Sequence, residues 1–201
     1  SIWMRIKEKL NLLIMELQIE KAVNILKKGG IIIFPTDTAF GIGCRMDNEN
    51  SVKRLVSIRK RPRNQPTPVL FNNIMAIKEY LLDIPKEVKE KLMDNYWPGA
   101  LTIILPCKTD KVFNLIRGGS NNIGVRIPDD GNLISIIEKL EVGILGPSAN
   151  FHGKPTPYHF DDLDPELIKL VDYVLEGSCK IKEQSTVIDC SVNPWKLIRE
   201  G

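Results

Sequence analysis

Hydrophobic residues recur along the chain with two spacings, one typical of helices and one typical of buried strands. Apolar residues at helical spacing, among them Leu10, Leu13 and Leu17, predict a helix from Met4 to Lys28. Short β-branched runs such as Ile31 to Phe34 predict strands that are buried on both faces. The same criteria predict further helices at 49–58, 74–82, 86–93, 133–140 and 163–170, and strands at 69–71, 101–105, 123–127, 142–145, 173–175, 186–190 and 195–198.

The predicted helices and strands are interspersed without strict alternation. We therefore expect an α/β fold whose twisted, open sheet has mixed strand direction and is flanked by helices. The longest polar breaks, 59–68 and 150–157, are too short to be linkers between domains. The chain of 201 residues is long enough to bury a core, so we expect a single domain, 1–201, with an N-terminal helical extension at 1–17.

Composition and charge narrow the class of protein only slightly. The 28 basic and 25 acidic residues leave a net charge of +3, which by itself does not identify a partner. Four scattered cysteines and two histidines form no metal-binding pattern. The sequence shows no secretory signal and no apolar run of about 20 residues, so we expect a cytoplasmic protein without a membrane partner.

Two loops rich in glycine and hydroxyl groups directly follow predicted strands, at 35–43 and at 146–150. Each is compatible with a turn that satisfies its own polar groups, or with a loop that binds a polar ligand at the carboxyl end of a strand. In the second loop, Ser148 and Asn150 offer a hydroxyl and an amide toward one point. These groups suit phosphate oxygens or the water shell of a metal ion.

Four cations, Arg59, Lys60, Arg61 and Arg63, fall within five positions after the helix predicted at 49–58. They repel one another unless an anion lies nearby, and guanidinium groups bind phosphate with two parallel hydrogen bonds. The alternative is a solvated helix end that complements the helix dipole. Arg126, between apolar strand residues, needs a carboxylate partner from the protein or from a substrate.

Taken in order, these stretches resemble the YrdC-like family of threonylcarbamoyl-AMP synthases. The resemblance covers nearly everything from Gly29 onward. It rests on PTDTAFGIGC (35–44), IRKRPRNQP (58–66), WPGALTIIL (97–105), IGVRIPD (123–129), GPSAN with GKPTP (146–157), STVID (185–189) and LIREG (197–201).

The resemblance implies an open α/β sheet around a large, concave, basic cavity, and a nucleotidyltransferase that makes L-threonylcarbamoyl-adenylate from L-threonine, bicarbonate and ATP. Pyrophosphate would be released, and a separate transferase complex would use the product to modify adenosine 37 of tRNA. Mg²⁺ would arrive with ATP, without a protein metal site. Two alternatives stay open: a protein of the same fold that binds tRNA or double-stranded RNA, and a paralogue that adenylates a different carbamate.

The resemblance also implies roles for individual residues. L-Threonine would contact Thr38, Arg126 and Ser185, with Arg126 pairing the carboxylate. The catalytic residues would be Arg59, Arg61, Ser148 and Asn150. ATP would contact Arg61, Gln65, Asn122, Gly146, Ser148, Thr156 and Arg199. The chain departs from the family pattern in having arginine at 59 in place of lysine, Phe40 in place of tyrosine, Gln184 in place of glutamate, and no histidine near Leu70.

Overall fold

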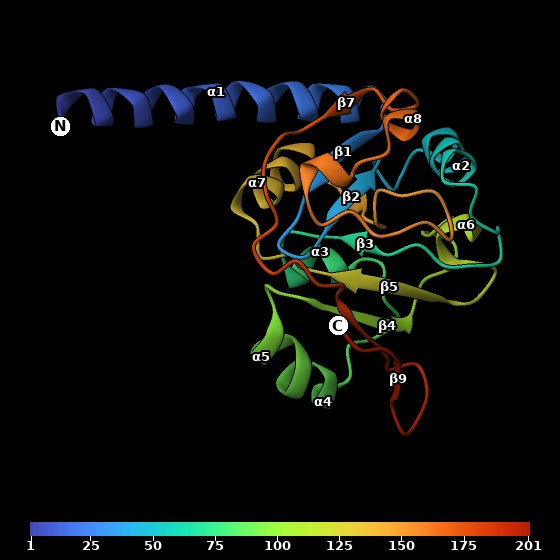
Figure 1. Cartoon of the computed structure of the whole chain (residues 1–201). Helices are drawn as coiled ribbons and strands as arrows, with labels where there is room; N and C mark the ends of the chain where they lie inside the picture. The colour runs from blue at the N-terminus through green and yellow to red at the C-terminus, as the bar shows by residue number, and fades with distance from the viewer.

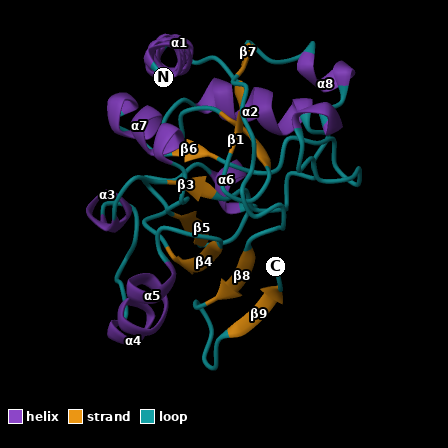
Figure 2. Ribbon diagram, turned by 60° about the vertical axis from the view of Figure 1, so that its left-hand side comes forward, coloured by secondary structure: helices purple, strands orange, loops and turns teal.

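The strands form two sheets in the computed structural model, which describes residues 1–201 (Figures 1 and 2). The strands are β1 (Ile32–Pro35), β2 (Phe40–Gly43), β3 (Val69–Leu70), β4 (Leu101–Pro106), β5 (Asn122–Arg126), β6 (Ile144–Leu145), β7 (Tyr173–Val174), β8 (Thr186–Asp189) and β9 (Lys196–Arg199). One sheet has the order β2-β1-β7 and the other β6-β3-β5-β4-β8-β9. Parallel and antiparallel pairs occur in both, which confirms the predicted fold class of mixed strand direction.

Helices flank both sheets. They are α1 (Ile2–Lys27), α2 (Glu49–Ile58), α3 (Ile74–Lys78), α4 (Lys86–Val88), the π-helical turn η1 (Lys89–Met93), α5 (Asp94–Tyr96), α6 (Asn114–Arg117), α7 (Gly131–Leu140), the 3₁₀ turn η2 (Phe160–Asp162) and α8 (Pro165–Ile168). The C-terminal part of α1 packs against α7, while its N-terminal part extends away from the body (Figure 1). None of these helices combines the length and the apolar character that a membrane crossing requires.

Strand β1 is buried on both faces, as its uninterrupted apolar sequence predicts. Ile33 joins the main hydrophobic core between the sheets and helices α2 to α6. Ile32 and Phe34 point the other way, into a smaller cluster beneath α1 and α7. Because successive side chains of a strand point to opposite faces, one four-residue strand connects the two cores.

The structure corrects three of the predicted elements. The segment 40–43, expected as part of a loop, is strand β2, because Gly41 and Gly43 make room for the ring of Phe34 on the paired strand. Helix α3 ends at Lys78 and not at 82, since the backbone at 80–82 pairs with the end of β4. Helix α8 begins only after Asp164, which caps it ahead of a proline at its first position.

The two sheets meet along the loop that follows β6. Ile42 N donates to Pro147 O at 2.9 Å, and Ala149 N donates to Phe40 O at 2.8 Å. An isolated bridge between Gly41 and Ser148 completes this junction. The junction therefore brings together the two glycine-rich loops that the sequence analysis singled out.

Candidate functional site

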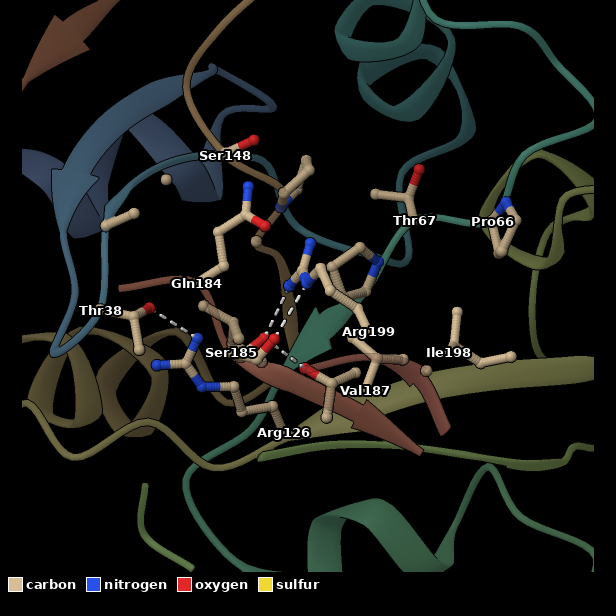
Figure 3. A pocket seen from close by; sticks show the side chains of 18 of the residues that line it. Thr38, Pro66, Thr67, Arg126, Ser148, Gln184, Ser185, Val187, Ile198 and Arg199 are labelled. Carbon is tan, nitrogen blue, oxygen red and sulfur yellow. Dashed lines mark hydrogen bonds between the residues drawn. The ribbon is translucent and has the colours of Figure 1, made fainter. Parts of the chain in front are cut away.

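A cavity of about 580 Å³ lies where the two sheets meet (Figure 3). Its floor is one face of the larger sheet, because alternate residues of β5, namely Asn122, Gly124 and Arg126, all line it. Four arginines, 59, 61, 126 and 199, reach its wall, against a single carboxylate, that of Asp189. The cavity is therefore a concentrated cationic site in a chain of low net charge.

The loop after β1 is both a self-satisfied turn and part of the cavity wall. Thr36 makes the turn: its Oγ1 accepts from the backbone N of Thr38 at 3.0 Å and of Ala39 at 3.1 Å, and donates to Ala39 O at 2.7 Å. Thr38 also lines the cavity, where its Oγ1 accepts from Arg126 Nη1 at 3.0 Å (Figure 3). Both interpretations of this loop therefore hold, because Thr36 satisfies the turn and both threonines line the cavity.

Arg126 is buried, with only 5% of its surface exposed, and it is held by three groups. Its Nε donates to Gly99 O at 3.0 Å, its Nη1 donates to Thr38, and its Nη2 donates to the Asp37 carboxylate. Burial lowers the pKa of Arg126, and the Asp37 carboxylate counteracts this shift. A guanidinium has five N–H groups, so one on each terminal nitrogen remains for a ligand. This pair of donors suits a carboxylate.

Ser185 and Arg199 form the adjoining part of the wall. Arg199 Nη2 donates to Ser185 Oγ at 3.0 Å and Arg199 Nε donates to Ser185 O at 2.9 Å, while Ser185 Oγ lies 3.1 Å from Thr102 Oγ1 (Figure 3). Arg199 belongs to β9, whose pairing with β8 brings it to the cavity. On its own, the position of Arg199 is typical of an exposed terminus, but the sheet register makes it part of the site.

The basic loop after α2 divides its cations between the cavity and solvent. Arg59 and Arg61 line the cavity, whereas Lys60 lies over the ring of Phe151 and Arg63 is exposed. Arg59 is only 3% exposed, its Nε donates to Asn150 O at 3.3 Å, and its Nη1 has no partner. Arg61 Nη2 donates to Pro66 O at 3.0 Å, and its buried Nε has no partner.

Burial, with a smaller contribution from Arg61, lowers the pKa of Arg59 to about 10. The pKa of Arg61 is also lowered, by burial and by the charge of Arg199. Thr67, between two prolines on the same wall, adds a buried hydroxyl without a partner. Buried donors without acceptors on a cationic wall suit an anion rich in oxygen atoms.

The loop after β6 presents Ser148 to this wall. Gly146 permits the approach, because a Cβ there would collide with the side chain of Leu70. Ser148 Oγ donates to Asn150 Oδ1 at 2.5 Å, and Asn150 Nδ2 donates to Lys154 O at 2.8 Å. The side chain of Asn150 therefore stabilises the loop, and its backbone carbonyl accepts a hydrogen bond from Arg59.

The far end of the floor is polar and uncharged apart from Asp189. Asn122 Nδ2 donates to Ser191 Oγ at 3.2 Å, and Ser191 Oγ donates to Asp189 Oδ1 at 2.5 Å. This arrangement leaves Asn122 Oδ1 and Asp189 Oδ2 as acceptors at the cavity wall. Between them and Arg126 the floor is apolar, formed by Gly124, Ile104 and Val187.

All but two of the site residues named from the sequence line this one cavity. The exceptions are Gln65, in the basic loop, and Asn150, which acts through Ser148 and Arg59. Thr156 does line the cavity, and its Oγ1 accepts from Gln184 Nε2 at 2.8 Å.

Sequence reasoning missed several residues of the site. The partner of Arg126 was left open as a carboxylate of the protein or of a substrate, and the structure shows that it is the protein carboxylate Asp37. Thr67 and Asp189 carried no motif of their own, although a threonine held between two prolines is a usable signal. Gln184 was noted only as a departure from the family pattern, and it lies in the cavity wall (Figure 3).

Nowhere in the chain do three or more His, Cys, Asp or Glu side chains gather closely enough to hold a metal ion. The cavity wall contributes no cysteine, histidine or lysine either. Its chemistry is therefore that of arginines, hydroxyls and amides. Such groups bind and orient oxygen-rich anions and neutralise their charge.

The fold and the site together define a mixed α/β protein with one large cavity lined by arginines, hydroxyls and amides. A family model described as "Telomere recombination", which covers the Sua5, YciO and YrdC proteins, matches residues 24–201. The chain belongs to this Sua5/YciO/YrdC family, which confirms the resemblance seen in its motifs.

Two relatives illustrate the range of the family. The threonylcarbamoyl-AMP synthase of Bacillus subtilis strain 168 is 33% identical over 188 residues, which are 92% of this chain and 53% of that protein. YciO of Escherichia coli K12, described as uncharacterized, is 29% identical over 188 residues, which are 91% of this chain and 88% of that protein. The chain thus spans about half the length of the synthase and most of the length of YciO.

Solved structures give the same picture. Sua5 of Pyrococcus abyssi, in complex with L-threonine, superimposes with a TM-score of 0.84 at 31% identity, over 92% of this chain and 54% of that one. E. coli YciO superimposes with a TM-score of 0.83 at 27% identity, over 93% of this chain and 90% of that one.

Proposed function

We propose that this chain uses L-threonine, bicarbonate and ATP to make L-threonylcarbamoyl-adenylate, and releases pyrophosphate. The observation that carries the proposal is the pairing of two anion sites in one cavity. Arg126 offers two free N–H groups to a carboxylate, and Arg59 and Arg61 face the same space with donors that lack partners. A synthase that joins an amino acid to a nucleotide needs both sites. Relatives named threonylcarbamoyl-AMP synthase, and a Sua5 that binds L-threonine, support this assignment.

In this proposal the threonine carboxylate binds Arg126 beside Thr38, within reach of Ser185. The neutral threonine amine attacks the carbon of bicarbonate, and loss of water leaves an N-carboxylate. An oxygen of that carbamate then attacks the α-phosphorus of ATP, and the bond to the β-phosphate oxygen breaks to release pyrophosphate. No protein nucleophile takes part, so catalysis rests on orientation and on charge neutralisation.

The cationic wall would neutralise the triphosphate. Arg59, Arg61 and Arg199 would offer guanidinium donors to its oxygens, with Ser148 adding a hydroxyl. Asn122 and Asp189, at the opposite end of the floor, would accept hydrogen bonds from the nucleoside. Their distance along β5 from Arg126, about 13 Å for four residues, leaves room for a nucleotide between the two ends.

Magnesium would enter with ATP. Asp189 is the one carboxylate in the wall, which fits a Mg²⁺ ion held mainly by phosphates and water and not a dedicated protein site. The ion would neutralise charge on the phosphates. The adenylate would then pass to a separate transferase complex, which attaches its threonylcarbamoyl group to adenosine 37 of tRNA.

The test is direct. Purified chain is incubated with labelled L-threonine, bicarbonate, ATP and Mg²⁺, and the products are separated. We expect a labelled adenylate and equimolar pyrophosphate. The Arg61→Ala variant should lose about a hundredfold in kcat/KM for ATP. Lys60→Ala is the matched control and should keep full activity, because this neighbouring cation faces Phe151 and not the cavity.

Two results would contradict the proposal. The first is that the folded chain forms no adenylate with any amino acid. The second is that the Arg61→Ala variant retains full activity. An adenylate with a different amino acid from a panel, and none with L-threonine, would instead identify a paralogue that uses another carbamate. That outcome bears on Gln184 and Phe40, which depart from the family pattern and line the cavity.

A further inference from the structure

The N-terminal half of α1 projects from the body without a neighbour (Figure 1). Its C-terminal half is anchored by Ile19, Ala22, Val23 and Leu26, which are buried among residues of α7 and β1. Every residue from 1 to 14 is exposed. A helical segment of this length is marginal in water when it packs against nothing, so the projecting half is a feature that needs a partner.

The exposed half carries apolar side chains on several sides, and one continuous apolar stripe runs along it. The exposed apolar residues outside this stripe are Ile2, Met4, Leu12 and Ile14. The residues of the stripe follow the 3-4 spacing of a coiled coil, and they are 44–67% exposed: Trp3, Ile6, Leu10, Leu13 and Leu17. At 3.6 residues per turn, this stripe lies on roughly the opposite side of the helix from the anchored face. A second helix can therefore cover it without displacing the body. Glu20 and Asn24, which continue the spacing beside the body, are also exposed.

The charges change sign along the helix. Arg5, Lys7 and Lys9 accompany a single acid, Glu8, in the first ten residues, and of these Lys7 and Lys9 flank the stripe. The next ten carry Glu16 and Glu20 and no cation. A parallel pair would place the basic segments of two copies side by side. An antiparallel pair places each basic segment beside an acidic one.

We propose that this stripe is a dimerisation surface and that two copies of the chain pair through α1 in antiparallel orientation. In the matching register Leu10 of one copy packs against Leu13 of the other, and Ile6 packs against Leu17. Lys9 then flanks the stripe beside Glu16 of the second copy, and two-fold symmetry makes this ion pair twice. The two bodies lie on opposite sides of the helix pair.

A second copy fits this surface better than a lipid bilayer does. Helices that lie on anionic membranes carry a polar face rich in lysine and arginine. Here Glu8, Glu16 and Glu20 interrupt the basic residues. Self-pairing uses both signs, because each acidic segment meets a basic one. The inference does not depend on the proposed function, since α1 contributes no residue to the cavity.

Sedimentation velocity of the full chain over a wide concentration range tests the proposal. We expect the mass to rise from 22.8 kDa to twice that value as the concentration increases. The double variant Leu10→Glu/Leu13→Glu should stay monomeric with an unchanged fold by circular dichroism, because neither side chain touches the body. Leu12→Glu is the matched control: Leu12 is 66% exposed but lies off the stripe, so this variant should still dimerise.

A charge swap tests the orientation. Lys9→Glu should weaken dimerisation about tenfold, because two attractive pairs become repulsive, and adding Glu16→Lys should restore it. A wild-type chain that is monomeric at every concentration overturns the proposal, and so does a swap that fails to restore association. A monomer that co-sediments with vesicles of phosphatidylcholine and phosphatidylglycerol also overturns it, in favour of a lipid surface.

Discussion

Arg59 and Arg61 are cations to which the protein gives no anion of its own, and Arg59 is buried while Arg61 is half-buried. Arg59 Nη1 and Arg61 Nε are buried and lack hydrogen-bond partners. Arg126 differs, because Asp37 compensates its charge within the protein. Burying an uncompensated charge lowers the free energy of unfolding. Arg59 and Arg61 therefore keep donors available for a ligand at a cost in the stability of the fold.

Replacing Arg59 should therefore trade activity for stability. We expect Arg59→Met to raise the free energy of unfolding by about 2 kcal/mol, since an apolar side chain of similar length removes a buried charge. The same variant should lose most of its ATP-dependent activity under the proposed function. Urea unfolding measures the first effect and adenylate formation the second. A variant that is less stable and fully active would contradict both expectations.

The pH dependence of this gain has a defined sign. Burial places the pKa of Arg59 in the folded state, about 10, below the ordinary arginine value. Between these values the unfolded chain binds more protons than the folded chain, so stability from this group rises with pH. Below about pH 10 both states carry the charge and the cost is complete. The advantage of Arg59→Met should thus be constant near neutral pH and shrink above pH 10.

Strand β5 shows how an element distributes chemistry. Its alternation places Asn122, Gly124 and Arg126 on the cavity face, and Ile123 and Val125 in the core. The register with β4 puts Ile104 beside Gly124. The strand thus carries a buried guanidinium at one end, a polar amide at the other and an open apolar floor between them.

Gly124 keeps that floor open, and a side chain there should close it. A Cβ on Gly124 would lie 3.5 Å from Thr102 Cγ2 and 3.8 Å from Pro68 Cα, which are ordinary contacts. We expect Gly124→Val to fold with a stability within about 1 kcal/mol of the wild type, because valine suits a strand. Its side chain should raise the Kd for ATP about tenfold or more by filling the cavity. Thermal unfolding and isothermal titration calorimetry check the two effects, and Gly124→Ala should fall between wild type and valine.

At the scale of the whole molecule, the charge is low but unevenly placed. A net charge of +3 spans 201 residues, while four arginines face one cavity with a single acid. The charges of these arginines influence one another, since Arg199 lowers the pKa of both Arg61 and Arg126. A polyanion that enters the cavity should relieve this repulsion and stabilise the fold.

Inorganic pyrophosphate, as the probe, should therefore raise the Tm. At a concentration of about 100 times its Kd, the stabilisation is about 2.7 kcal/mol, which shifts Tm by several degrees. Added salt should reduce the shift by weakening binding. Arg61→Ala should lose most of it, whereas Arg63→Ala should keep it, because Arg63 is exposed outside the cavity. Equal shifts in both variants would show that pyrophosphate binds elsewhere.

Local patterns were sufficient for the elements whose signal lies in their own residues. The apolar run of β1, the periodicity of α2 and α7 and the long helix α1 were all confirmed within two residues. Local patterns failed where a segment distant in the sequence decides which element forms. Strand β2 forms because Phe34 on the paired strand needs its glycines, and α3 stops early because its last turn pairs with β4.

The same division holds for the site and for the molecule. The sequence by itself determined the mixed α/β class, the residue types that would bind anions, and the family, because composition, periodicity and ordered motifs are properties of the chain. Only the tertiary structure decided that Asp37 pairs with Arg126, that Arg199 joins the cavity, and that Lys60 and Arg63 stay outside it. These facts depend on sheet register and burial, which join residues far apart in sequence, and no local pattern contains that information.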